Sequence, residues 1–372
     1  MVVGFHRRTY AKIDLNAIKH NISVEKEKMD SNQKLFAVVK ANAYGHGIVE
    51  VAKVAHEVGV EGYCVAIIDE ALALRQADLN ELILVLGVTP FEYAPLMAEN
   101  DISTAVGDID FLKNAQKLLE QRKLRLSIHL ALDTGMGRIG FRNQEELQAA
   151  VDFINQYSNQ FNFEGIFTHF ATADSKKRDA VDYYDKQLKK FKNLETCLKT
   201  LPRYVHVANS AASIWHKECG GNTVRFGISM YGLNPSGREL DSPDFKLAFS
   251  LMSEIVAIKE INKGDSIGYG KTYTAKDSEW IATVPIGYAD GWSRKMQGFK
   301  VLINGFFCEI VGRVCMDQIM VRVPQEYKVG TAVTLIGKDS NKKITPQEVA
   351  DQMNTIHYEV LCLISERVPR IY

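Results

Sequence analysis

Eight short apolar segments recur in the first 228 residues, and longer segments with a helical spacing of apolar residues separate them. This alternation is typical of a parallel sheet covered by helices, because strands buried on both faces are continuously apolar. Eight such strands close into a TIM-type barrel within about 250 residues. An open, doubly wound sheet is the alternative. The predicted strands are 35–41, 62–67, 83–87, 102–107, 124–133, 163–170, 204–209 and 223–228.

The pattern changes after Leu240, where strands and turns replace the alternation of strands and helices. We therefore expect two domains, a (β/α)8 barrel at 1–240 and a mainly-β domain at 241–372. One late helix is marked by Thr345 as its cap, Pro346 at its first position and Glu348, which completes a capping box. The predicted strands of the second domain lie within 249–258, 279–289, 300–314, 318–324 and 331–337.

Composition excludes several classes of partner. The chain has 372 residues with 45 basic and 45 acidic side chains, so no net charge favours nucleic acid or an anionic membrane. The six cysteines are scattered, which argues against structural zinc and a disulfide framework and favours a reducing compartment. No apolar leader or membrane-spanning run is present. We expect a soluble cytoplasmic protein that binds a small molecule or another copy of itself, and no metal.

Lys40 is the first candidate for chemistry, because active sites of barrels lie at the C-terminal ends of the strands. It ends the apolar run Leu35–Val39, so its amine points toward the barrel mouth. A partly desolvated lysine loses its proton more readily and can form a Schiff base with an aldehyde cofactor. An isolated lysine here would more often extend to solvent or pair with a carboxylate, so its neighbours must decide.

The ends of the seventh and eighth strands are suited to a phosphate group, which barrels often bind with these two loops. Ser210 follows Asn209 at the start of a predicted helix, where free backbone N–H groups attract an anion. Gly227 and Ile228 end the eighth strand in a similar turn. Ser210 is equally well explained as a helix cap. Tyr44 could add a hydroxyl from the first loop.

Arg225 lies inside the eighth strand, where a buried charge requires a specific partner. A pyridine nitrogen is such a partner, and a guanidinium donates to it without giving up its proton. The cofactor then withdraws electrons less strongly, which shortens the life of a carbanion and favours return of the proton to Cα over transamination. His206 on the seventh strand could support Arg225, although such a histidine is more often a structural core residue.

Several longer motifs together carry a resemblance to the alanine racemase family, over residues 10–372. That family has a barrel followed by a β domain, uses pyridoxal 5'-phosphate, and works as a homodimer whose active sites combine both chains. The resemblance therefore implies a racemase of L-alanine and D-alanine that supplies D-alanine for peptidoglycan. The motifs are AVVKANAYGHG, ALDTGMGRIGFR, IFTHFATAD, ANSAAS, VRFGISMYGL, IGYGKTYTA, PIGYADGW, VGRVCMDQ and IHYEV.

The resemblance also implies residue roles. Lys40 resembles the Schiff-base lysine, and Tyr269 resembles the opposing base, supplied by the partner subunit, with His169 as its hydrogen-bond partner. Inversion at Cα requires two groups on opposite faces, which this pair provides. Arg138 and the Met316 backbone would receive the substrate carboxylate. The remaining implied residues are Tyr44, His206, Asn209, Ser210, Arg225, Gly227, Ile228 and Tyr358 for the cofactor, and Tyr288, Arg294 and Arg313 for the substrate entrance.

One position departs from the family pattern. Many relatives have a lysine, often carbamylated, two residues before the aspartate of DTGMGR, but this chain has Ala131 before Leu132 and Asp133. A carbamate there would orient Arg138 by a bidentate pair. We therefore expect Arg138 to be less fixed here, or held by water or an anion.

Three alternatives remain open. A barrel-type decarboxylase of basic amino acids would share the Schiff-base lysine, but it is expected to place a carboxylate on the pyridine nitrogen, where this chain has Arg225. A non-catalytic pyridoxal phosphate carrier would have no need of Tyr269. An ordinary metabolic barrel with a structural Lys40 would bind no chromophore. Within the racemase interpretation a small pocket excludes an added hydroxyl poorly, so serine could be a slow substrate.

Overall fold

The computed structural model describes residues 2–216 and 219–372, which form two compact units. The barrel unit comprises Asn16–Ala43 and Gly47–Lys246. The β-rich unit comprises residues 2–15, Tyr44–His46 and Leu247–Tyr372. The division expected at residue 240 counted the N-terminal residues with the barrel, whereas the structure groups them with the β-rich unit.

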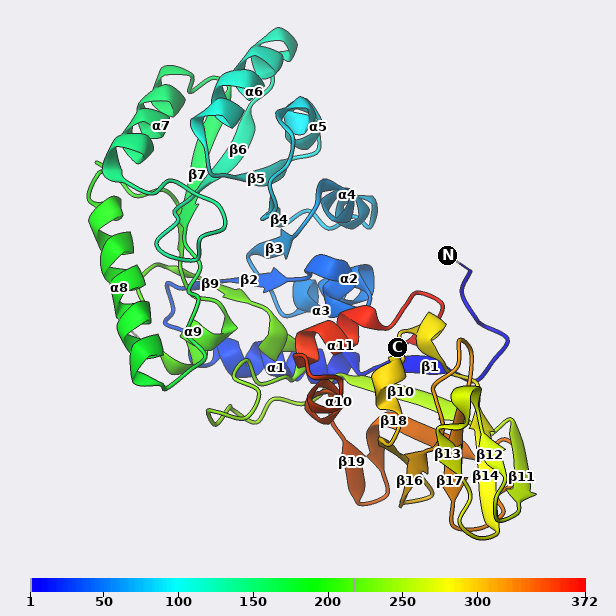
Figure 1. Cartoon of the computed structure of the whole chain (residues 1–372). Helices are drawn as coiled ribbons and strands as arrows, with labels where there is room; N and C mark the ends of the chain where they lie inside the picture. The colour runs from blue at the N-terminus through cyan, green and yellow to red at the C-terminus, as the bar shows by residue number, and fades with distance from the viewer. Residues whose placement is uncertain (1, 217–218) are drawn as a thin grey trace. The chain divides into compact units, whose positions relative to one another are not determined.

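Eight parallel strands form the sheet of the barrel unit, and helices surround it (Figure 1). Its two end strands meet. A bridge pairs Ala208, just after β8, with Val224 of β9, and the Arg225 N–H donates to the Ala208 carbonyl at 2.9 Å. The predicted barrel is thus confirmed, nearly closed, and the open sheet is excluded. In sheet order the strands are β8 (Tyr204–His206), β7 (Phe161–Phe167), β6 (Leu126–Ala131), β5 (Ile102–Val106), β4 (Leu82–Val85), β3 (Gly62–Val65), β2 (Lys34–Val38) and β9 (Thr223–Phe226).

The longer helices of the barrel unit each bury one face. In α8 (Arg178–Glu195) the buried positions include Tyr184, Gln187 and Phe191, which recur every three or four residues and so lie on one side. Asp108 caps α6 by accepting from a backbone N–H of its first turn. The other helices of this part of the chain are α1 (Leu15–Lys26), α2 (Lys40–Tyr44), α3 (Ile48–Glu57), α4 (Ile68–Gln76), η1 (Phe91–Tyr93), α5 (Ala94–Glu99), α6 (Ile109–Arg122), α7 (Gln144–Gln156), α9 (Ser210–Trp215) and η2 (Ile228–Tyr231).

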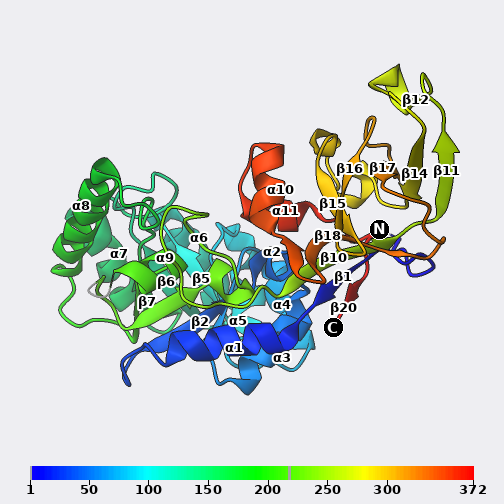
Figure 2. The same ribbon diagram turned by 90° about the horizontal axis from the view of Figure 1, so that it is seen from below.

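A sheet of ten strands dominates the described β-rich unit (Figure 2). The N-terminal β1 (Tyr10–Ile13) runs antiparallel to β10 (Phe249–Glu254) and parallel to β20 (Arg370–Ile371). Every second residue of β10 is buried, so one face of the sheet supplies the core. The other elements are β11 (Ala257–Ile261), β12 (Ser266–Ile267), η3 (Tyr269–Lys271), β13 (Tyr273–Thr274), β14 (Glu279–Val284), η4 (Tyr288–Asp290), η5 (Arg294–Met296), β15 (Lys300–Ile303), β16 (Phe306–Ile310), β17 (Ile319–Val323), β18 (Ala332–Asp339) and β19 (Lys342–Ile344).

Two helices follow the last long strands, α10 (Pro346–Met353) and α11 (His357–Leu363). The predicted capping box of α10 is confirmed, because Thr345 Oγ1 accepts from the Glu348 N–H at 3.2 Å and the Glu348 carboxylate accepts from the Thr345 N–H at 2.6 Å. None of the helices described is long and apolar enough to cross a membrane.

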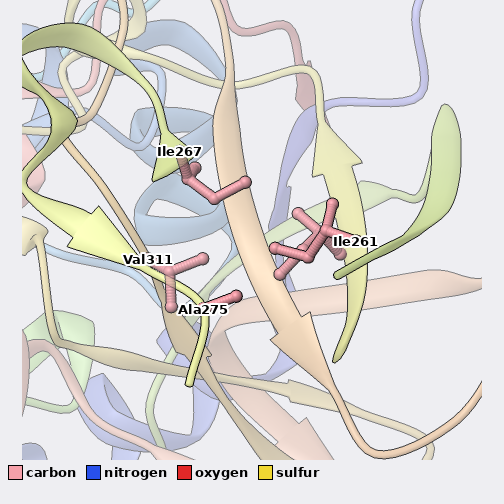
Figure 3. Close-up of a cluster of buried hydrophobic side chains, with 5 residues drawn as sticks. Ile261, Ile267, Ala275 and Val311 are labelled. Atoms are coloured by element: carbon pink, nitrogen blue, oxygen red, sulfur yellow. The ribbon is translucent and has the colours of Figure 1, made fainter. Parts of the chain in front are cut away.

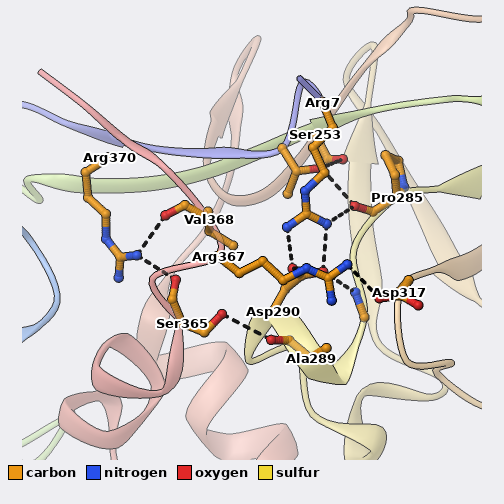
Figure 4. Close-up of polar contacts among 12 residues, drawn as sticks. Arg7, Ser253, Pro285, Ala289, Asp290, Asp317, Ser365, Arg367, Val368 and Arg370 are labelled. Carbon is orange, nitrogen blue, oxygen red and sulfur yellow. Dashed lines mark hydrogen bonds and ion pairs between the residues drawn. The ribbon is translucent and has the colours of Figure 1, made fainter. Parts of the chain in front are cut away.

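A buried carboxylate ties the N-terminal residues into the β-rich unit (Figure 4). The side chain of Asp290 is fully buried and receives both terminal nitrogens of Arg7. Arg367 approaches the same carboxylate at 3.5 Å and also pairs with Asp317 at 2.6 Å. A buried carboxylate left without such partners would be strongly destabilising, so these arginines compensate its loss of hydration.

Candidate active site

The predicted groups of the barrel unit gather at the C-terminal ends of its strands. Lys40 comes two residues after the end of β2, and β2 is hydrogen-bonded to β9, which carries Arg225. Burial, and then the charges of Arg225, Arg138 and Lys40, hold the pKa of His169 well below its usual value. These three cations and one neutral imidazole therefore lie within electrostatic reach of one another.

An unusual turn follows Lys40. The four residues 41–44 all have positive φ, between 52° and 54°, which makes one turn of left-handed helix. Each residue with a Cβ destabilises the fold by roughly 1–2 kcal/mol in this conformation, so the turn requires stabilising contacts. Glu70 supplies it, because its carboxylate accepts from the Asn42 N–H at 3.1 Å and from the Ala66 N–H at 2.8 Å. Asn42 in turn accepts from the Ile48 N–H at 2.8 Å.

Arg225 is 3 % exposed and makes its hydrogen bonds through its two terminal nitrogens. Nη1 donates to Nδ1 of His206 at 2.9 Å and to the His206 carbonyl. Nη2 donates to the Thr168 carbonyl at 2.8 Å and to Nδ1 of His169 at 3.3 Å. Burial lowers the pKa of Arg225 to about 10, so the guanidinium stays charged at neutral pH. Within the described residues no carboxylate forms an ion pair with it.

These contacts determine where His169 carries its proton. The guanidinium can only donate, so Nδ1 of His169 must accept. A neutral imidazole has one N–H, which therefore lies on Nε2. The Nδ2 atom of Asn209 is 3.5 Å from that nitrogen, too long for a strong bond. His169 thus offers an N–H donor to a group that approaches its Nε2.

The loops after β8 and β9 are joined by one hydrogen bond. The Gly227 N–H donates to Ser210 Oγ at 2.8 Å, and Ser210 and Ile228 are both buried. Asn209 is the N-cap of α9 and accepts from the Ala212 N–H at 2.9 Å. The other N–H groups at the start of α9 have no partner within the helix, and together with the Ser210 hydroxyl they are donors suited to an anion.

Arg138 lies in a loop shaped by Asp133, whose carboxylate accepts from the Gly135 N–H at 3.1 Å and from the Gly137 N–H at 2.9 Å. The Arg138 side chain is exposed, and in the described part of the chain no hydrogen bond or ion pair holds it. Ala131 is 1 % exposed and packs in an apolar cluster. The other members of that cluster are Ala105 and Phe167, and the partly buried Leu86 and Ile139 pack against it.

Tyr44 and Tyr358 belong to the β-rich unit and lie beside each other, with ring centroids 6.2 Å apart. Gly45, next to Tyr44, has a φ of +83° and accepts at its carbonyl from Arg370 Nε at 2.9 Å. A Cβ on Gly45 would meet the Leu361 carbonyl at 2.5 Å. This close approach explains why a glycine follows Tyr44.

Tyr269 begins η3, between the short strands β12 and β13, and is 71 % exposed. Arg313 lies beside this turn, because a Cβ on Gly270 would be 3.0 Å from its Nη1. A small buried cluster anchors the hairpin (Figure 3). It comprises Ile261, Ile267, Ala275, Ile281 and Val311, with Tyr273 and Met320 packed against it.

The remaining predicted residues are exposed on the β-rich unit. Tyr288 is 43 % and Met316 is 54 % exposed. Backbone hydrogen bonds join their segments, since the Tyr288 N–H donates to the Cys315 carbonyl and the Ala289 N–H to the Met316 carbonyl. Arg294 begins η5 and is exposed, and within the described chain it makes no hydrogen bond or ion pair with these residues.

The predicted residues thus form separate groups. The barrel unit brings together Lys40, Arg138, His169 and Arg225, and it joins the loops of Ser210 and Gly227. The β-rich unit carries the tyrosines at 44 and 358 and, elsewhere, the exposed group around Tyr269. Sequence reasoning missed Glu70, His129 and Glu164. The last two are polar residues within apolar strands, the signal that identified Arg225.

Comparison with known proteins assigns both parts of the chain to one family. Residues 13–235 match the alanine racemase N-terminal domain family, and residues 248–372 match the alanine racemase C-terminal domain family. The chain is 60 % identical to the alanine racemase of Ligilactobacillus salivarius over 373 residues, which covers 100 % of both proteins.

Solved structures give the same result. The alanine racemase of E. faecalis has a TM-score of 0.97 at 50 % identity, with 100 % of both chains covered. A histidine racemase from Leuconostoc mesenteroides subsp. sake has a TM-score of 0.92 at 35 % identity, over 99 % of each chain. An alanine racemase from Bartonella henselae with covalently bound pyridoxal phosphate has a TM-score of 0.87 at 28 % identity, covering 98 % of this chain and 99 % of that one. The chain therefore belongs to the alanine racemase family of isomerases.

Proposed function

We propose that this chain interconverts L-alanine and D-alanine with pyridoxal 5'-phosphate, and that Lys40 and Tyr269 of the partner subunit act on opposite faces of Cα. The observation that carries the proposal is Arg225, a charged guanidinium that is 3 % exposed and has no carboxylate partner among the described residues. Its two terminal nitrogens donate to neutral acceptors. Among the described residues, however, its Nε–H has no acceptor, and the ring nitrogen of the cofactor is one.

The residues present fit this cofactor. Lys40 supplies an amine for its aldehyde, and the joined loops of Ser210 and Gly227 supply donors for its phosphate. The hydroxyls of Tyr44 and Tyr358 and the backbone of Ile228 complete the phosphate site in this proposal. When bound, pyridoxal phosphate withdraws electrons from the substrate and makes its Cα proton more acidic.

Arg225 favours a racemase over a decarboxylase. A carboxylate facing the ring nitrogen would leave a proton on it and increase its electron demand, whereas a guanidinium donates without releasing its proton. The moderate electron demand favours rapid return of the proton to Cα. His206 holds Arg225 in this role through the bond from Nη1 to Nδ1 at 2.9 Å.

The two-base mechanism requires Tyr269 to accept and return a proton. We propose that the Nε2–H of His169 donates to the phenolic oxygen of Tyr269 and so orients it toward Cα. Tyr269 is 71 % exposed in one chain, which suits a residue that a second copy buries. Lys40 then serves one face of Cα and Tyr269 the other.

We assign the substrate carboxylate to Arg138 and the Met316 N–H, with Tyr288, Arg294 and Arg313 at the entrance. Alanine is favoured by the relative of 60 % identity that shares the full length. Histidine is the second candidate, because a histidine racemase has the same fold at 35 % identity. A panel of amino acids including alanine, serine and histidine separates these possibilities by kcat/KM.

The direct test follows L-alanine in deuterated water with added pyridoxal phosphate, reading Cα deuterium and the fraction of D-alanine together. We expect D-alanine that carries deuterium at Cα. Exchange without inversion in the wild type would contradict the two-base mechanism, since only one face would then be served. A Tyr269→Phe variant, tested separately with L-alanine and D-alanine, is expected to exchange deuterium into only one of them, the enantiomer whose Cα proton faces Lys40, with little interconversion.

We further propose a cytoplasmic role in supplying D-alanine for peptidoglycan. The six cysteines are all free thiols, which suits a reducing compartment. A deletion strain of the source bacterium should then require added D-alanine for growth. Growth without it would contradict this role if no second alanine racemase were present.

A further inference from the structure

A line of buried polar side chains extends from Arg225 across the inside of the barrel unit. Arg225 Nη1 donates to His206 Nδ1, and His206 Nε2 lies 2.8 Å from His129 Nδ1. His129 Nε2 lies 3.2 Å from Glu164 Oε2, which also accepts from Ser103 Oγ at 2.7 Å. We call these five residues the relay.

The relay occupies an apolar interior, where each polar atom needs a partner. His129 and His206 are 0 % exposed, and Ser103 is 4 % exposed. Stacking fixes both imidazole planes, since Tyr204 lies on His129 with an interplanar angle of 12° and Phe167 lies on His206 with an angle of 10°.

The backbone also makes room for the relay. His129 pairs with Gly165 across β6 and β7, and a Cβ on that glycine would collide with His129 Nδ1, the atom that faces His206. A glycine is therefore required here by the ring of its neighbour.

The charge states along the relay follow from burial and hydrogen bonding. Burial lowers the pKa of both imidazoles, so His129 and His206 are neutral at pH 7. Burial would raise the pKa of Glu164, but hydrogen bonds from His129 and Ser103 and nearby positive charge outweigh it and lower that pKa. The relay thus places two neutral imidazoles between a carboxylate and a guanidinium.

The two ends impose the same proton positions. Glu164 as a carboxylate only accepts, so His129 carries its N–H on Nε2 and accepts at Nδ1. His206 must then donate from Nε2 and accept at Nδ1. Arg225 only donates, which independently requires the same acceptor at His206 Nδ1. Every bond of the relay is satisfied in this single direction.

We propose that Glu164 is a positioning residue for catalysis. It fixes the proton positions of His129 and His206 and, through these two histidines, the orientation of Arg225. This inference rests on the proposed function, because it takes Arg225 to face the cofactor ring. Glu164 also provides the negative charge that the guanidinium lacks in direct contact. Without a carboxylate at position 164 the Nε2–H of His129 loses its charged acceptor, so the proton positions of both imidazoles are no longer fixed from that end.

The first experiment uses the cofactor-free protein. Nitrogen-15 NMR of its histidines, assigned with His129→Gln and His206→Gln variants, should show His129 and His206 neutral with the proton on Nε2 in both. A proton on Nδ1 of either residue, or a charged imidazole, would overturn the inference. The NMR measurement does not depend on enzyme activity, so its outcome tests the relay independently of the racemase proposal.

The second experiment compares Glu164→Gln and Glu164→Met with Glu239→Gln in the cofactor-loaded enzyme. Glu239 is a matched control, because it also accepts from a serine, Ser175 at 2.7 Å, but has no histidine behind it. We expect kcat for alanine to fall about tenfold in both Glu164 variants, equivalent to about 1.4 kcal/mol of barrier. KM should change less than about twofold, since Glu164 touches no substrate, and the fraction of turnovers ending in pyridoxamine phosphate should rise.

Either of two results would contradict a positioning role. One is that both Glu164 variants have the same kcat as Glu239→Gln and that their histidine NMR signals are unchanged. The other is an equal loss in kcat with histidine signals and pyridoxamine formation like wild type, which indicates general damage to the fold. If both variants fail to fold, Ser103→Ala should shift the His129 signal and raise pyridoxamine formation in the same direction, and an unchanged spectrum would count against the proposal.

Discussion

Arg225 donates to Nδ1 of two histidines. The bond to His206 holds the guanidinium in place, and the bond to His169 leaves that imidazole with its N–H on Nε2, where it can donate to another group. The sequence predicted Arg225 and His206 because charged or polar side chains inside an apolar strand need a specific partner. The same argument applied to His129 in β6 and Glu164 in β7, yet neither was singled out, because the pairing of these strands was needed to see that they meet.

Ala131 leads to a prediction at the scale of one residue. Ala131→Lys should lower the KM for alanine, because a carbamate on the new lysine would hold the exposed Arg138 by a bidentate pair. KM is to be measured in bicarbonate-containing and carbon dioxide-free buffers. Ala131→Met is the matched control, since it adds similar bulk to the apolar cluster of Ala131 without forming a carbamate. An unchanged KM in protein shown by mass spectrometry to be carbamylated would exclude this account.

At the scale of elements, the left-handed turn after β2 shows where sequence reasoning stops. Asn42 belongs to a residue type that adopts positive φ readily, but the alanines and the tyrosine beside it do not. Residues 41–44 therefore gave no sign of a complete left-handed turn. The turn persists because the Glu70 carboxylate accepts from the Asn42 N–H and Asn42 Oδ1 accepts from the Ile48 N–H. The Glu70 contact forms only once α4 is in place. The eight barrel strands and the capped α10 were predictable because their signals are local.

Because of this turn, we expect a substitution by glycine to stabilise the fold, whereas in most helices it destabilises it. Ala41 is exposed with a φ of +53°, so Ala41→Gly should raise the free energy of unfolding by about 0.5–1 kcal/mol. The relief of strain exceeds the extra entropy of glycine in the unfolded chain. Ala73→Gly, in the right-handed α4, should instead lower it by about 1 kcal/mol. Urea denaturation of the cofactor-free protein measures both, and equal losses would refute the strain argument.

At the scale of the whole molecule, buried neutral histidines make stability depend on pH. Burial lowers the pKa of His357 to about 4, so the folded chain binds a proton less readily than the unfolded chain. The stabilisation is complete above about pH 6.5 and is lost as the pH falls toward 4. His357 alone should remove about 2 kcal/mol between pH 7.5 and pH 5. His129, His169 and His206 act in the same direction.

Urea denaturation at the two pH values checks this dependence. His357→Phe should reduce the loss of stability at pH 5, because it removes one of the buried titrating groups. His56→Gln should not reduce it, since the hydrogen bond and charge of Glu81 raise the pKa of the exposed His56. A His357→Phe variant with the full loss would show that other groups determine the acid sensitivity.

The proposed sharing of Tyr269 between subunits makes activity depend on association. Specific activity should fall on dilution, in parallel with the appearance of monomer by analytical ultracentrifugation. Added pyridoxal phosphate must stay saturating, so that loss of cofactor does not imitate dissociation. Constant specific activity in a solution shown to be monomeric would exclude the shared site.

The pairing of β1 with β10 and β20 has a consequence for synthesis on the ribosome. The first strand emerges early, yet its partners leave the exit tunnel only after the whole barrel unit has been translated. The nascent N-terminal segment must therefore wait unpaired while the barrel can already fold. Removing the first 13 residues would not affect translation of the barrel unit. It would remove β1, and β10 and β20 would then lack the strand that lies between them in the sheet.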